Sequence, residues 1–427
     1  MHLRFLLLLL CALFCSRVAL AAQPPLNPND WNFVLVPSFE SQTGNGNNLS
    51  STGLNHALRF GQLLNSILAG KQGQVRQVYV FTYAGDNSMV PLETIEPYAL
   101  LNNLGVTAQA LSPGDASVYN SPAYFMQQLL GNQPRGTYVM AMPPAMLQEV
   151  VSTLGNGSLS LDGTHQYVVL SGREQPFAIS SYNDQIANVA DYPNVLPQQL
   201  PRSACPQSSV TIQAKAPKGW QPYTEQKVYL VRHVEAHPTG NFENGNYVCQ
   251  GQWRALGANG RLLKIMGNRK PDHVFTSNPA NIIGCTGTCS YIRPSLTVAP
   301  FAIQYDLPLT LAQFQWSDAI DLAQALFNRD SPYFKHAPSN QTILVGWEHA
   351  HIEEAVKYLL ATMYGNADAA KQVPAWSFED YDTVWELSTN KDGELTFRNT
   401  CEGIPTAALP STCPAFFQSL PQSPSTP

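Results

Sequence analysis

Charged residues are scarce in this sequence of 427 residues: they make up 13% of it, and the net charge is −6. A chain with so few cations lacks the positive field that nucleic acids attract, so we expect no nucleic-acid partner. An anionic ligand such as phosphate would need a local cluster of cations. Cysteine is also missing from most of the first half, with none between Arg17 and Ala204. Any disulfide bonds are therefore expected in the second half.

Beyond its first residues, the sequence has no apolar run that approaches transmembrane length, so no membrane span is expected. The one early run, Phe5–Phe14, is short and follows a weakly basic start at Met1–Arg4. Ala19-Leu20-Ala21 then has the small-x-small form of a cleavage site. These features predict a signal peptide over residues 1–21 and a secreted or periplasmic protein.

Six cysteines remain after the predicted signal peptide, and an even number in an exported chain predicts disulfide bonds. The sequence does not determine their pairing. Short separations favour the local pairs Cys401–Cys413 and Cys285–Cys289. None of the cysteines has the CxxC spacing of metal ligands, and we expect neither a metal nor a cofactor.

An apolar strand, Val228–Val231, delivers Arg232 and His233 into a loop rich in proline and glycine. Strand Phe33–Val36 has the same pattern near the start of the chain, but Pro37-Ser38 follows it. A strand that ends in residues with catalytic chemistry places them at the rim of a sheet, where α/β proteins build their sites. The sequence thus contains two copies of one strand pattern, and different residues follow the strand in each copy.

The repeat continues through both halves. The matched segments are Leu49–Ala57 with Val248–Ala255, Val78–Thr82 with His273–Thr276, Thr94–Pro97 with Tyr291–Pro294, and Gly136–Met140 with Gln341–Val345. Strands alternate with helices, which predicts two α/β domains. Each is expected to have three layers, α/β/α, around a mainly parallel sheet.

The domains are expected over residues 26–194 and 228–417. A linker rich in Pro, Gln and Ser (195–227) separates them, and a disordered tail of similar composition (418–427) follows.

Four side chains of the second half are expected to meet where its parallel strands end and its helices begin. Arg232 and His233 end one strand, Arg293 opens a helix, and His349 follows a later strand. Two guanidinium groups fit the oxygens of a phosphoryl group, and a neutral imidazole is a competent nucleophile. The sequence therefore predicts a phosphate site that carries its own nucleophile and needs no metal.

These elements resemble the histidine phosphatase superfamily, which is phosphoglycerate-mutase-like. The resemblance covers the second half and rests on the Arg-His pair after a strand, the Gly251/Ala255 helix, the SxxxRxxxTxA pattern of Ser290–Ala299, and the late His349. It implies that His233 is phosphorylated during the reaction. It also implies that Arg232, Arg293 and His349 bind the phosphoryl group. The longer RHGxRxP signature is absent, which favours the mutase and small-phosphatase branch.

One departure from the superfamily concerns the general acid. Many mutase-like members carry a glutamate in the loop after the helix that Arg293 opens, but Leu307–Phe314 contains none. We expect Glu348 to protonate the leaving oxygen, ahead of Asp306 and Asp318.

The first half lacks the residues of the phosphate site. The alignment of the two halves places Pro37, Ser38, Glu96 and Pro144 at the positions of Arg232, His233, Arg293 and His349. Both cations and the nucleophile are absent, and Glu96 would repel phosphate. The first half is therefore predicted to fold as an inactive domain.

The leading hypothesis is an exported phosphomonoester hydrolase, independent of metals, that acts on a phosphorylated small molecule or a phosphoprotein. One alternative is an exported phosphate-binding or phosphoester-binding protein with vestigial catalysis. A metal-dependent hydrolase that uses His233, His237, His349 and His351 is disfavoured, since Pro238 argues against the helix that would join the first two. The natural substrate and the oligomeric state are left open.

Overall fold

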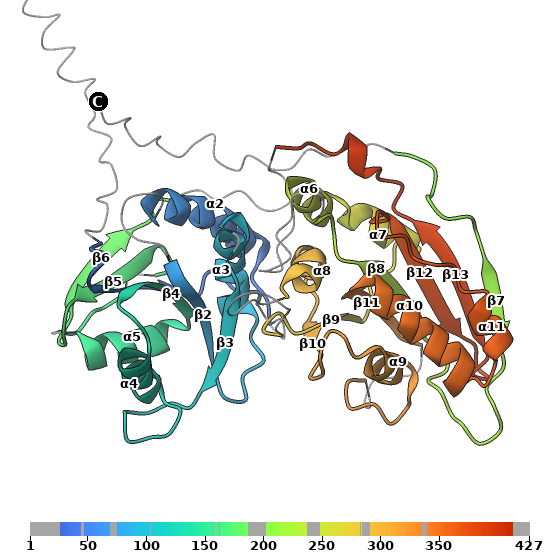
Figure 1. Cartoon of the computed structure of the whole chain (residues 1–427), viewed down its shortest axis with the longest axis horizontal. Helices are drawn as coiled ribbons and strands as arrows, with labels where there is room; N and C mark the ends of the chain where they lie inside the picture. Colours follow the sequence, from blue (N-terminus) through green and yellow to red (C-terminus); the bar gives the residue numbers. More distant parts are fainter. Residues whose placement is uncertain are drawn as a thin grey trace, which may run out of the picture.

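The computed structural model describes residues 26–43, 47–68, 75–102, 104–155, 157–161, 163–186, 202–236, 248–281, 283, 291–334 and 340–412 (Figure 1). The predicted signal peptide, the predicted tail, the pair Cys285–Cys289 and His237 lie outside the described residues. No helix within the described ranges has the length and apolar character that crossing a membrane requires.

The chain forms two sheets with the same topology. The first has the strand order β3-β2-β4-β1-β5-β6 and the second β10-β9-β11-β8-β12-β13-β7. The strands of the first sheet are β1 (Trp31–Pro37), β2 (Val75–Tyr83), β3 (Val106–Leu111), β4 (Gly136–Met142), β5 (Gln166–Gly172) and β6 (Ala178–Asn183). Those of the second are β7 (Thr211–Ala214), β8 (Lys227–Arg232), β9 (His273–Thr276), β10 (Leu309–Leu311), β11 (Thr342–Trp347), β12 (Thr383–Thr389) and β13 (Leu395–Cys401). Strands β1–β6 correspond one for one to β8–β13.

Each sheet is mixed. The four strands β3, β2, β4 and β1 are parallel, as are β10, β9, β11 and β8, while the later strands are antiparallel. The apolar sequences of β1 and β11 are buried throughout, as expected of central parallel strands covered on both faces. The predicted α/β fold class is therefore confirmed, with the parallel part of each sheet at one side.

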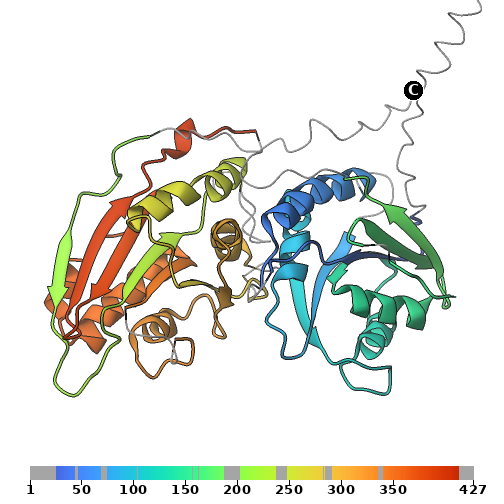
Figure 2. The same ribbon diagram turned by 180° about the vertical axis from the view of Figure 1, so that it is seen from behind.

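Helices cover both faces of each sheet (Figures 1 and 2). They are α2 (Ser51–Leu68), α3 (Val90–Leu101), α4 (Pro122–Asn132), α5 (Pro144–Leu154), α6 (Cys249–Gly257), α7 (Asn259–Ile265), α8 (Arg293–Tyr305), α9 (Ala319–Phe327), α10 (His349–Tyr358) and α11 (Ala367–Lys371), with a π-helical turn at Leu359–Met363 and a 3₁₀ turn at Thr406–Ala408. Helices α2, α3, α6 and α8 lie between the two sheets (Figure 1). Their apolar side chains form one continuous cluster, so the two halves share a core.

Part of the predicted linker belongs to the second domain. Strand β7 lies within residues 195–227 and pairs with β13 at the edge of the second sheet. The same segment carries Cys205, which is bonded to Cys401 with a Cα–Cα distance of 5.4 Å. The predicted pair Cys401–Cys413 is therefore wrong. The pairing of β7 with β13 brings Cys205 close to the end of β13. The distance between the two cysteines in the sequence gives no indication of this.

Helix α3 begins earlier than predicted. It starts at Val90 and has Pro91 in its first turn, whereas Thr94–Pro97 was the predicted start. Pro97 instead lies inside the helix. Either proline suits the first turn of a helix, where a missing N–H costs no hydrogen bond. The sequence alone therefore does not tell which proline marks the start of α3.

The structural equivalent of Arg293 is consequently Val90 and not Glu96. Each half has a threonine in the same pair of hydrogen bonds, between the loop after its first strand and the head of a helix. In the first half, Phe39 N donates to Thr94 Oγ1 (3.1 Å), which donates to Val90 O (2.7 Å). In the second half, Val234 N donates to Thr297 Oγ1 (3.0 Å), which donates to Arg293 O (2.9 Å). The first half thus has an apolar side chain where the second has a guanidinium group.

Candidate active site

The predicted site lies where β9, β11 and β8 end. These three strands are neighbours in the parallel part of the second sheet, and Trp347 at the end of β11 is in register with Arg232 at the end of β8. His233 follows directly, and its backbone N–H donates to Trp347 O at 2.8 Å. Helices α8 and α10 begin at the same edge with Arg293 and His349. The topology therefore brings the four predicted residues to one edge.

Arg232 is buried and held by a loop before β12. Its Nη1 donates to Phe378 O at 2.5 Å and to Asp380 O at 3.3 Å. Its guanidinium carbon lies 4.0 Å from the centre of the Tyr381 ring, a distance at which cation–π attraction contributes about 1–2 kcal/mol in a desolvated place. These contacts fix the guanidinium beside His233.

His233 has the protonation state that a nucleophile needs. Its Nδ1 lies 2.8 Å from Val234 O, and because a carbonyl only accepts, Nδ1 carries the hydrogen. Burial, and then the positive charges of Arg232 and Arg293, hold the pKa of His233 well below its ordinary value. The imidazole is therefore neutral at pH 7, with its lone pair on Nε2.

The head of α8 is positioned by close packing against β11. A Cβ placed on Gly346 would lie 2.7 Å from Val298 Cγ1 and 3.0 Å from Pro294 O. Only glycine permits this approach without a shift of the helix. Thr297 then joins the helix to Val234, so that Arg293 and His233 are held in one frame.

Glu348 caps helix α10 and binds two histidines. Its carboxylate accepts from the backbone N–H of His351 at 3.0 Å and contacts His351 Nδ1 at 2.7 Å, and it also pairs with His349 Nδ1. His349 in turn lies against the ring of Phe378, with 6.0 Å between ring centres, and Phe378 also contacts Arg232. His349 is thus held close to Arg232 through its contact with Phe378.

The structure disfavours the three residues expected as the general acid. Burial alone raises the pKa of Glu348, but its bonds to His349 and His351 outweigh burial and hold that pKa well below its ordinary value. A carboxyl that stays ionised is a poor proton donor. Asp306 lies at the opposite end of α8 from Arg293, and Asp318 binds Gln315 N at the start of α9.

Sequence reasoning missed two supports of the site. Tyr381, on which Arg232 lies, is far away in the sequence and has no motif around it. The other is a buried ionic cluster centred on Arg254 of α6, whose guanidinium group binds three carboxylates. Its contacts are Glu235 at 2.6 Å, Glu402 at 2.8 Å and Asp382 at 3.3 Å. It anchors the loop that carries His233, because Glu235 follows that residue by two positions.

The histidines considered for a metal hydrolase do not form such a site in the described part of the chain. The one group there with suitable ligand spacing is Glu40, His56 and His165, in the first half. The predicted site offers cations and a neutral imidazole.

None of the protein-family models and none of the curated proteins matches this chain. Solved structures do match. Phosphoglycerate mutase from Plasmodium falciparum is 17% identical over 46% of this chain and 98% of its own, with a TM-score of 0.27. A mutant phosphoserine phosphatase from Entamoeba histolytica in complex with phosphoserine is 13% identical over 40% of this chain and 93% of its own, with a TM-score of 0.23. The structure named mycobacterial hydrolase 2 is 13% identical over 39% and 93%, with a TM-score of 0.26.

At these identities and TM-scores the likeness carries nothing about chemistry, and the function rests on the site.

Proposed function

We propose that the chain is an exported, metal-independent phosphomonoester hydrolase that works through a phosphohistidine on His233. The observation that carries the proposal is the buried imidazole of His233, which directs Nδ1 at Val234 O and lies at the sheet edge where Arg232 and Arg293 also lie. Arg232 and Arg293 neutralise the phosphoryl oxygens, and Nε2 of His233 attacks phosphorus as the alcohol leaves. Water then cleaves the phosphohistidine, which releases phosphate and restores the imidazole.

Leaving-group protonation is the weak step of this mechanism, because Glu348 is held as a carboxylate. Esters whose alcohols leave without a proton, such as aryl phosphates, should therefore react faster than alkyl phosphates. Glu348 is better suited to orient His349 and His351, and His349 to bind the phosphoryl group.

His233→Ala tests the proposal. Loss of the nucleophile should lower the turnover of an aryl phosphate by about three orders of magnitude or more, as measured by release of the phenol. Ser38→Ala changes the equivalent residue of the first half and should leave turnover unchanged. Acid-labile labelling of the wild type with phosphate should disappear in His233→Ala. Equal turnover by the wild type and His233→Ala would exclude the mechanism.

A phosphate-binding protein with vestigial catalysis is the second candidate, and the ionised state of Glu348 favours it. In that case, the wild type would bind phosphate or vanadate, lose this binding in Arg293→Ala, and turn over no phosphoester of a broad panel.

A further inference from the structure

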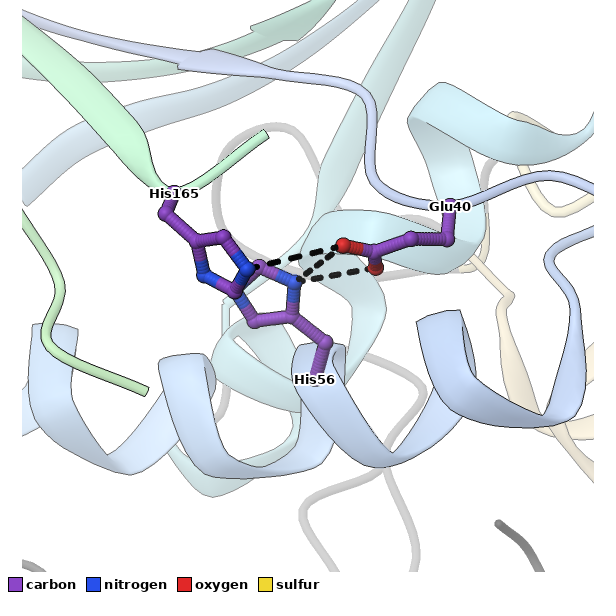
Figure 3. Close-up of side chains that lie close together, drawn as sticks. All are labelled: Glu40, His56 and His165. Carbon is purple, nitrogen blue, oxygen red and sulfur yellow. Dashed lines mark hydrogen bonds and ion pairs between the residues drawn. The ribbon is translucent and has the colours of Figure 1, made fainter. Parts of the chain in front are cut away.

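The first half contains a cluster of ionisable side chains that phosphate chemistry does not use. Glu40 follows β1, His56 lies on α2, and His165 precedes β5 (Figure 3). His56 Nδ1 lies 3.0 and 3.2 Å from the two carboxylate oxygens of Glu40, and His165 Nε2 lies 4.0 Å from one of them. The three ligand atoms all lie within 4.8 Å of one another. The ligands of a tetrahedral zinc ion are separated by about 3.4 Å, within this range of distances.

A fourth residue, Asp184, orients both imidazoles. Its carboxylate lies 2.7 Å from His56 Nε2 and 3.2 Å from His165 Nδ1. Because a carboxylate accepts, each of these two nitrogens carries a hydrogen. The other nitrogens, His56 Nδ1 and His165 Nε2, face Glu40 (Figure 3). The Glu40 carboxylate also accepts from His56 Nδ1, so a metal ion bound there would replace that proton. Histidines that bind metals are held in this way by a carboxylate behind them.

The equivalent place in the second half contains a fixed cation. Matching backbone hydrogen bonds identify the equivalent residues. Ser50 N donates to Glu40 O as Val248 N donates to Glu235 O, so Glu40 corresponds to Glu235. Asp184 N donates to His165 O as Glu402 N donates to Asp382 O, so Asp184 corresponds to Glu402 and His165 to Asp382. His56 occupies the helix position of Arg254, whose guanidinium group binds three carboxylates. The first half keeps two carboxylates there, Glu40 and Asp184, but replaces the long arginine by a short imidazole. A positive charge is required at both places.

Accessibility favours an ion from solution. The side chains of His56 and Asp184 are buried, whereas those of Glu40 and His165 are 29% and 42% exposed. An ion can therefore enter from solvent and keep water in a remaining position. Thr164 Oγ1 donates to Glu40 Oε1 at 2.5 Å and fixes that carboxylate.

We propose that Glu40, His56 and His165 bind a divalent transition-metal ion of the zinc type, oriented by Asp184. Two imidazoles and one carboxylate are a donor set that suits zinc and its neighbours better than magnesium or calcium. The proposal departs from the expectation of a chain without metal, and it is independent of the phosphatase proposal. Protons compete with a metal ion for imidazole nitrogens, so metal binding should weaken as the pH falls.

Metal titration of the full chain tests the proposal. Protein freed of metal with a chelator is titrated with Zn²⁺ by calorimetry, and with Co²⁺ by visible absorption, which reports nitrogen and oxygen ligands. His165→Gln, at a half-exposed side chain, should bind one equivalent fewer than the wild type and lose the rise in melting temperature that Zn²⁺ produces. Glu40→Gln should behave alike. His273→Gln, at a histidine packed against Phe334 in the second half, should bind as the wild type does.

Equal stoichiometry in the wild type and His165→Gln would overturn the proposal, and so would a wild type that binds no metal. In both cases an imidazolium on His56 would provide the positive charge between the two carboxylates. Aryl phosphate turnover should be unchanged in His165→Gln, so this test and that of the phosphatase proposal fail separately.

Discussion

Thr297 joins the loop that carries His233 to the head of α8 through two hydrogen bonds, and Thr94 makes the same two in the first half. The two threonines therefore have equal structural roles, but only Thr297 lies beside His233, the proposed nucleophile. This pair separates the contribution of the hydrogen bond to stability from its contribution to catalysis.

Replacement of Thr297 by valine keeps the shape of the side chain and removes its hydroxyl. The buried N–H of Val234 then lacks its acceptor, which costs about 1–3 kcal/mol of unfolding free energy. We expect kcat/KM for an aryl phosphate to fall about 10- to 100-fold, because His233 and Arg293 lose their common frame. Thr94→Val should lose comparable stability in urea unfolding and keep its turnover. Equal turnover in both variants would show that the frame does not depend on this bond.

Helix α8 lies directly on β11 at Gly346, and this contact sets where Arg293 begins the helix. A strand residue without a side chain thus determines the position of a charged group on another element. There is no room for a side chain at this position, because Pro294 O and Val298 both lie within 3.0 Å of the place that a Cβ on Gly346 would occupy.

Gly346→Ala should therefore push α8 away from the sheet. We expect a loss of about 1–3 kcal/mol in unfolding free energy, as for other overpacked positions. Vanadate should also bind more weakly, because Arg293 moves with the helix. Gly260→Ala is the matched control: this glycine of α7 has no atom within 4 Å of its Cβ position, and alanine there should stabilise the helix slightly. Unchanged vanadate binding in Gly346→Ala would contradict the assigned role.

The convergence of Arg232, His233 and Arg293 at one edge follows from the sequence, because apolar strands that alternate with helices put strand ends and helix starts together. The start of α3 does not follow from it. Pro91 and Pro97 are equivalent in local terms, and the start at Val90 goes with a tertiary contact, the hydrogen bond from Phe39 N to Thr94.

The Arg254 cluster was beyond prediction for a similar reason. Its partners come from segments up to 148 residues away in the chain, and nothing local marks them as partners. The ionisation of Glu348 was not predictable from the sequence either. The charge of that residue depends on two histidines that meet only when α10 forms.

The two halves meet through buried polar side chains as well as apolar helices. Ser295 Oγ donates to Glu96 Oε1 at 3.2 Å across the boundary, and Asn48 Nδ2 donates to Leu307 O at 2.5 Å. Burial raises the pKa of Glu96 to about 8, so the folded protein carries a proton there that the unfolded chain releases above its ordinary pKa of 4.5. The interface between the halves is therefore sensitive to pH.

The unfolding free energy should consequently fall as the pH rises from about 4.5 to 8, and the contribution of Glu96 should be constant above that range. Glu96→Gln keeps an acceptor for Ser295 and cannot ionise. It should reduce this slope and raise the unfolding free energy at pH 7 by about 3 kcal/mol, as measured by urea unfolding across pH. Glu174→Gln, at an exposed glutamate, should reproduce the wild-type profile. A wild-type slope in Glu96→Gln would assign the pH dependence to other groups.

The bond between Cys205 and Cys401 closes a covalent ring around the second half, and its two ends are 196 positions apart in the sequence. Strands β7 to β13 and the candidate active site all lie inside that ring, while the first half is attached outside it. A single cut in any loop of the ring leaves both pieces joined, so backbone cleavage there does not by itself separate the parts of the site. Closing a loop of this size also removes about 5 kcal/mol of entropy from the unfolded chain in the chain-entropy account. The half with the candidate active site is thus the half in which the disulfide bond keeps the two pieces of a cleaved chain together.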